Sequence, residues 1–85
     1  MQYCLAVFRS RTQVFEFTDI LLGGGVNCKV VSTPADAHIG CGVCAKFPRI
    51  NLPFAEDVIN RYSLTSFKGF YIYEKTPYGV RTGRL

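Results

Sequence analysis

Residues 2–13 read Gln-Tyr-Cys-Leu-Ala-Val-Phe-Arg-Ser-Arg-Thr-Gln, and the architecture can be worked out from this stretch. The segment 2–8 is rich in residues that favour β-strands. Ser10 to Gln13 then shows the Ser-x-x-Gln pattern of a helix capping box. Apolar residues recur at helical spacing after it. The sequence therefore predicts a strand at 2–8 that leads into a helix at 11–22.

The rest of the chain continues this alternation. Glycines at 23–25 end the first helix, because glycine adopts the left-handed cap easily. We expect further strands at 26–33, 42–47 and 67–74, and a second helix at 52–62. This order predicts an α+β fold, a ferredoxin-like βαββαβ sandwich. Its four-stranded antiparallel sheet, in the spatial order 4-1-3-2, would carry both helices on one face.

Composition indicates a single small globular domain. The chain has 85 residues, of which 48% are apolar, and this content excludes a disordered tail. We expect the domain to span 1–75 and to be followed by a basic C-terminal tail at 76–85, where proline and glycine break the pattern. No apolar run approaches the roughly 20 residues of a membrane span. We therefore expect a cytoplasmic protein that does not bind membranes.

The net charge is modestly positive. Ten Lys and Arg against six Asp and Glu leave +4, with small clusters at Arg9/Arg11 and Arg81/Arg84. This pattern is typical of a solubilising surface, and attraction to an acidic partner or to RNA is the alternative. Because the charge is scattered, we do not expect nucleic acid to be the main partner.

Four cysteines, Cys4, Cys28, Cys41 and Cys44, could supply chemistry. In a cytoplasmic protein they are expected to be thiols. Zinc sites usually bring sulfurs as two close pairs, and here only one pair is close. We therefore expect no metal site and no cofactor. Cys4 and Cys28 lie inside predicted strands, where packing roles are expected.

The segment Cys41-Gly42-Val43-Cys44 is a C-x-x-C motif. Cys41 lies where a loop meets a strand, between Gly40 and Gly42, which leaves its sulfur open to a second protein. Cys44 falls inside the strand and is either a packing residue or a resolving thiol. Residues three apart in a strand face opposite sides, so a disulfide would require Cys41 to stay in the loop.

The expected topology brings a second group of residues toward Cys41. The end of the first strand, the start of the first helix and the loop at 35–40 should share one end of the sheet. Positive charge, a helix N-terminus and backbone N–H groups there would favour a thiolate. His38 could also be a base, a metal ligand or a surface residue. The candidate substrate- or anion-binding residues are Arg9, Ser10, Arg11, His38, Gly40 and Gly42.

An aromatic run in the fourth predicted strand favours a different function. Residues 68–73 resemble the aromatic strand of RNA-recognition motifs, whose rings stack on bases. That signature belongs on the third strand, whereas here it falls on the fourth, which should be an edge. A dimer face is the other interpretation. Its residues would be Tyr3, Leu5, Val30, Tyr71 and Tyr73.

The chain resembles the small putative selenium/sulfur carrier-protein-like family. The resemblance covers 1–47 well and the rest in outline. Two departures are Cys44, where the family usually has a small apolar residue, and the loop 37–40, which is poor in serine. The motifs that carry the resemblance are Phe8-Arg9-Ser10, Ser32-Thr33-Pro34 and Cys41-Gly42.

The resemblance implies that Cys41 holds sulfur as a persulfide or selenium as a selenopersulfide. It implies a carrier or thiol relay in preference to a stand-alone enzyme. The partners would be a donor such as a cysteine desulfurase and an acceptor protein, and the chain could form a homodimer. Two alternatives stay open: a module that binds protein or RNA through the aromatic strand, and a metal or redox thiol site.

Overall fold

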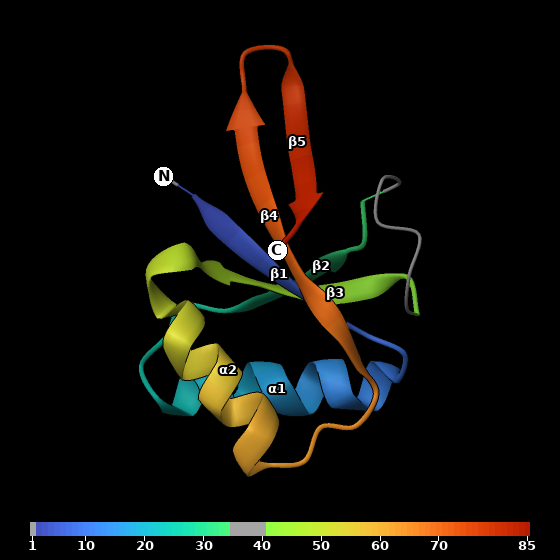
Figure 1. The fold of residues 1–85 in the computed structure, drawn as a ribbon, viewed down its shortest axis with the longest axis vertical. Coiled ribbons are helices and arrows are strands. Elements are labelled where there is room, and N and C mark those ends of the chain that lie inside the picture. The colour runs from blue at the N-terminus through green and yellow to red at the C-terminus, as the bar shows by residue number, and fades with distance from the viewer. Residues whose placement is uncertain (1, 35–40) are drawn as a thin grey trace.

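The computed structural model describes residues 2–34 and 41–85. Strands and helices alternate along this part of the chain, as Figure 1 shows. The elements in chain order are β1 (Tyr3–Phe8), α1 (Arg11–Gly23), β2 (Lys29–Ser32), β3 (Val43–Pro48), the short 3-10 helix η1 (Arg49–Asn51), α2 (Leu52–Arg61), β4 (Phe67–Thr76) and β5 (Gly79–Arg84).

The predicted mixed α+β fold with an antiparallel sheet and two helices is confirmed, but in the described part of the chain the sheet has five strands where we expected four. Their spatial order is β2-β3-β1-β4-β5, so the first four lie in the order predicted. Each neighbouring pair is antiparallel. The fifth strand means that the simple four-stranded ferredoxin-like sandwich does not describe this chain.

The expectation that proline and glycine break the pattern at 76–85 and leave a tail there is wrong. Residues Gly79–Arg84 form β5 and pair with β4, from Thr76 opposite Gly79 to Tyr71 opposite Arg84. Proline and glycine, which suggested a break in structure, instead make a tight turn, with Gly79 at φ +126°. β4 is therefore an interior strand, and the boundary expected after residue 75 falls inside it.

Both helices pack on the same face of the sheet. Alternate residues of β1, namely Cys4, Ala6 and Phe8, point toward α1 and α2 and join their buried side chains in one core. Aromatic rings fill its centre, with neighbouring centroids 4.7 to 6.0 Å apart in tilted or edge-to-face contact. The five rings that close this circle belong to Phe8, Phe17, Phe47, Phe70 and Phe67.

The other face of the sheet holds a second, smaller cluster of Leu5, Val7, Cys44 and Tyr71. Leu5 is 0% exposed and Tyr71 only 7% exposed, so this is not the open apolar face that we expected. Val30, which we also placed there, packs with the helix-side core. The reason is strand alternation: Val31, not Val30, lies opposite Cys44.

The turn from β1 into α1 is held by side chains from distant segments. Ser10 Oγ accepts a hydrogen bond from the Gln13 backbone N–H at 3.4 Å, as the capping pattern predicts. Gln13 does not complete the reciprocal bond. Its Oε1 accepts from the Ser66 N–H at 2.9 Å and from the Ser66 hydroxyl at 2.7 Å. Ser66 Oγ in turn accepts from the Ser10 N–H at 3.2 Å, so Ser66 joins this turn to the start of β4.

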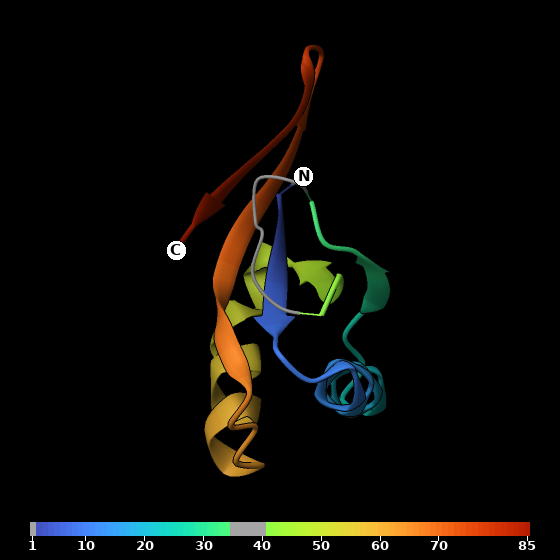
Figure 2. The same cartoon turned by 90° about the vertical axis from the view of Figure 1, so that its right-hand side faces the viewer.

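The hairpin of β4 and β5 gives the molecule its elongated outline. Figure 2 shows the hairpin projecting beyond the rest of the sheet and the helices, and Figure 1 shows the same from the front.

Within the described ranges, no helix has the length and apolar character needed to cross a membrane.

Candidate functional site

Cys41 and Gly42 lie directly before β3, at the end of the connection that follows β2. The Thr33 N–H donates to the Gly42 carbonyl oxygen at 2.9 Å and holds the two ends of this connection together. Gly42 is exposed and adopts φ +89°, a conformation that residues with a Cβ rarely take. The backbone therefore turns sharply immediately after Cys41 and then enters the strand.

The Cys41 side chain is half-buried. It packs against the margin of the helix-side core, as Val30 and Val43 also do. Its thiol donates a weak hydrogen bond to the Val43 carbonyl oxygen, with 3.6 Å between the sulfur and the oxygen. Within the described residues no carboxylate or imidazole bonds to this sulfur. The thiol therefore has partial access to solvent, and within the described residues it bonds to the backbone of β3, the strand that follows it.

The other three cysteines are buried free thiols. Burial raises the pKa of Cys4 and of Cys28, although weaker effects of Arg49 on Cys4 and of Thr18 on Cys28 oppose it. Burial also raises the pKa of Cys44, to about 11. A thiol with that pKa is almost entirely protonated at neutral pH and is a poor nucleophile.

Burial is the larger influence on the pKa of Cys44, and Thr33, which lies beside it, lowers that pKa. The Thr33 hydroxyl oxygen is itself buried and has no partner with good hydrogen-bond geometry among the described residues. The Thr33 hydroxyl is therefore a weak polar contact of Cys44, and burial decides the direction in which this pKa moves.

Cys41 and Cys44 lie on opposite faces of the sheet. Cys41 packs with the helix-side core, whereas Cys44 belongs to the cluster on the other face. Cys44 lies inside β3, whereas Cys41 precedes it and is separated from it by the turn at Gly42. Both are free, and this arrangement does not favour a disulfide between them or a resolving role for Cys44.

The turn between β1 and α1 lies at the same end of the sheet as the start of β3, as the topology predicted. Val7 of β1 is opposite Cys44 of β3, and both views show the two segments side by side (Figures 1 and 2). Arg9 and Arg11 are exposed there. Neither side chain forms a hydrogen bond with Cys41 in the described part of the chain. The Ser10 hydroxyl is engaged in capping α1.

His38 and Gly40 lie outside the described residues, so their expected roles stay predictions. Among the residues that are described, no group of three or more His, Cys, Asp and Glu side chains is arranged to hold a metal ion.

The aromatic strand offers little ring surface to a nucleic acid. Tyr71 is buried, and the Arg84 guanidinium lies 5.9 Å from its ring centroid. The Lys46 ammonium lies 4.6 Å from the ring centroid of Tyr3 and 4.4 Å from that of Tyr73. Cations of the same chain therefore already occupy positions over these rings.

The contribution of Ser66 was not visible in the sequence analysis. Its contacts with Ser10 and Gln13 cross more than fifty residues of sequence. A serine in a short polar segment carries no distinctive pattern, so only the tertiary structure reveals that Ser66 positions the turn beside the start of β3.

Comparison with models of protein families gives a match. A family model described as "Putative Se/S carrier protein-like" matches residues 3–72, which is most of the chain. The matched region includes Cys41 and Gly42 and ends inside β4. Searches of curated proteins and of solved structures returned no significant match.

Proposed function

The chain belongs to the putative Se/S carrier protein-like family, and from this membership we propose that it carries sulfur or selenium as a persulfide or selenopersulfide on Cys41. The observation that supports this choice of residue is exposure. Of the four cysteines, Cys41 alone is partly exposed, whereas Cys4, Cys28 and Cys44 are buried. A carrier must meet both donor and acceptor at its sulfur atom, and a buried thiol cannot do so.

Loading would be a transfer of one sulfur atom between thiols. The Cys41 thiolate attacks the outer sulfur of a donor persulfide, R–S–SH. The S–S bond of the donor breaks, a new S–S bond forms to Cys41, and the donor leaves as a thiolate with the bonding electron pair. The outer sulfur keeps its proton, and no external oxidant or reductant is needed. A selenopersulfide donor, R–S–SeH, would load selenium in the same way.

Unloading repeats the exchange with an acceptor thiolate as the attacking group. The expected partners are therefore a donor protein such as a cysteine desulfurase and an acceptor protein that takes the outer atom. In this scheme the chain is a carrier and not a stand-alone enzyme, because the chemistry at each step is supplied by its partners.

Several groups at this end of the sheet would stabilise the negative charge that the outer atom carries once it loses its proton to solvent. Gly42 is exposed, and among the described residues no atom beyond its chain neighbours lies within 4 Å of the position that a Cβ would take, so a partner can approach its backbone. Arg9 and Arg11 provide positive charge on the neighbouring turn. Charge-assisted contacts of this kind favour an anion. Cys44 has no part in the proposal.

The test is peptide mapping by mass spectrometry after incubation with a cysteine desulfurase and cysteine. We expect the mass of one sulfur atom to be added to the peptide that contains Cys41, and the addition to be reversed by a thiol reductant. Cys41→Ser should abolish it, and Cys44→Ala should leave it intact. Equal modification of every cysteine, or an unchanged yield in Cys41→Ser, would refute the assignment.

A further inference from the structure

Among residues 2–34 and 41–85, β5 is an edge strand, and its outward row of backbone groups pairs with no other strand. It pairs with β4 on one side and ends the sheet on the other. The Leu85 N–H donates to the Phe70 carbonyl oxygen at 2.9 Å, and bonded pairs alternate along an antiparallel ladder. The outward-pointing N–H and C=O groups therefore belong to Val80, Thr82 and Arg84.

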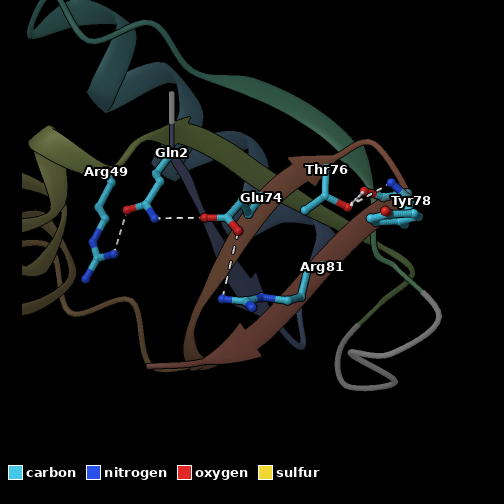
Figure 3. Close-up of polar contacts among 7 residues, drawn as sticks. Gln2, Arg49, Glu74, Thr76, Tyr78 and Arg81 are labelled. Carbon is cyan, nitrogen blue, oxygen red and sulfur yellow. Dashed lines mark hydrogen bonds and ion pairs between the residues drawn. The ribbon is translucent and has the colours of Figure 1, made fainter.

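Hydrogen bonds through Gln2 connect the β4–β5 hairpin to η1. Figure 3 shows the chain of contacts, in which Arg49 Nη1 donates to Gln2 Oε1 at 2.7 Å and Gln2 Nε2 donates to Glu74 Oε2 at 2.9 Å. The other Glu74 oxygen lies 3.8 Å from Arg81 Nη2. These contacts hold β4 and β5 in place, so the free edge is arranged before any partner arrives.

The tip of the hairpin is also fastened. The Thr76 hydroxyl donates to the Gly79 carbonyl oxygen at 2.8 Å and accepts from the Tyr78 N–H at 3.2 Å (Figure 3). Tyr78 itself is 98% exposed, and Val80 beside it is 44% exposed. The tip thus presents apolar side chains to the surroundings on a fixed backbone.

The charge of this edge is positive. β5 carries Arg81 and Arg84 and no acidic residue, and Lys75 lies opposite Val80 on β4. Glu74, the acidic residue of β4, is already bound to Gln2 and Arg81. Like charges on adjacent strands are unfavourable, so a second copy of β5 would be repelled. An acidic strand would be attracted.

Most of the hairpin lies outside the region that matches the family. That region ends at residue 72, whereas the paired part of the hairpin continues from Tyr73 to Arg84. The basic free edge of β5 therefore lies outside the region that the family match covers.

We propose that the free edge of β5 binds an extended acidic segment of another protein, which adds to the sheet as a sixth strand. The backbone groups of Val80, Thr82 and Arg84 provide the hydrogen bonds, and Arg81 and Arg84 select acidic side chains. Binding at this edge is independent of the sulfur chemistry, because β4 and β1 lie between β5 and the strand that follows Cys41.

The test uses two labelled peptides and fluorescence anisotropy. In one peptide threonine alternates with glutamate, and in the other threonine alternates with lysine. We expect the full chain to bind the glutamate peptide, more weakly as salt is added, and to bind the lysine peptide at least tenfold more weakly. Equal binding of both peptides, or no binding of the glutamate peptide, would overturn the proposal.

A matched pair of variants tests the backbone contact. Thr82→Pro removes one outward N–H, and we expect it to weaken glutamate-peptide binding by about fivefold to tenfold, the value of a single hydrogen bond. Thr82→Val keeps the N–H and should bind like the unchanged chain. Undiminished binding by Thr82→Pro would argue against strand addition.

Amide hydrogen exchange in the unchanged chain avoids any doubt about the folding of the variants. Bound peptide should slow exchange at Val80, Thr82 and Arg84, whose N–H groups point outward. Exchange at Arg81 and Gly83, whose N–H groups face β4, should change little. Uniform protection, or a chain dimer that Thr82→Pro dissociates, would contradict the proposal. Loading of sulfur on Cys41, measured in the same variants, should be unaffected.

Discussion

The pKa of Cys44 makes stability at alkaline pH a direct test of its burial. Burial raises this pKa from an ordinary value of 9.0 to about 11, so the folded state holds the thiol proton more tightly than the unfolded chain does. The contribution to stability is complete below pH 9 and is lost as pH rises toward 11, because the unfolded chain then loses its proton first.

The size of the effect follows from the two pKa values. With 9.0 in the unfolded chain and about 11 in the folded protein, the loss at pH 10 relative to neutral pH is about 1.4 kcal/mol. Full ionisation would remove about 2.7 kcal/mol. Either amount is a large share of the few kcal/mol expected for a domain of this length. Cys4 and Cys28, whose pKa values burial also raises, would add in the same direction.

Urea unfolding at several pH values, with a reductant present, measures this loss. Cys44→Ala should start less stable at neutral pH because it leaves a small cavity. Between neutral pH and pH 10 it should lose about 1.4 kcal/mol less than the unchanged chain, since other titrating groups are common to both. Parallel losses in the two proteins would refute the burial of a protonated Cys44 thiol and the argument that it cannot compete with Cys41 for sulfur.

Three further predictions concern stability, and urea unfolding at neutral pH checks each. Gly42→Ala should lower the free energy of unfolding by about 1–2 kcal/mol, because the φ of this residue is positive. Gly23→Ala should leave it unchanged or raise it, because this position is helical and no atom of the described residues lies within 4 Å of the added Cβ. Equal effects of the two substitutions would argue against the turn at Gly42. Ser66→Ala should lower the free energy of unfolding by about 1 kcal/mol, because Gln13 and the Ser10 N–H both lose a hydrogen-bond partner. An unchanged free energy of unfolding would mean that water replaces the hydroxyl. Phe47→Ala should lower the free energy of unfolding by about 3–5 kcal/mol, since the Phe47 ring packs between Phe17 and Phe70. A decrease below about 1 kcal/mol would contradict the close packing of the core.

The order of elements was predictable because it rests on local patterns. The capping pattern at Ser10 and the glycines after the first helix mark where α1 begins and ends, and the observed helix, Arg11–Gly23, differs from the expected range by one residue. Strand alternation predicted opposite faces for Cys41 and Cys44 only if both lay in the strand, and Cys41 lies just before β3. The distant partner of Gln13 was not predictable, because a contact with Ser66 leaves no local pattern.

The main error concerned the last ten residues. Proline and glycine there were interpreted as signs of fraying, and the same residues are equally suited to a tight hairpin turn. What distinguishes the two outcomes is the presence of a partner strand. β4 has a free side that can accept β5, and this is a property of the assembled sheet.

The amino-acid sequence by itself determined the succession of strands and helices, the apolar stripe of α1 and the position of a glycine-flanked cysteine before a strand, because each depends on neighbours within a few residues. The tertiary structure alone decided which thiol stays within reach of solvent, how far burial raises the pKa of Cys44, and that the chain adds a fifth strand with a basic free edge. The physical reason is that exposure, desolvation and strand pairing are set by segments far apart in sequence, which meet only once the sheet has formed.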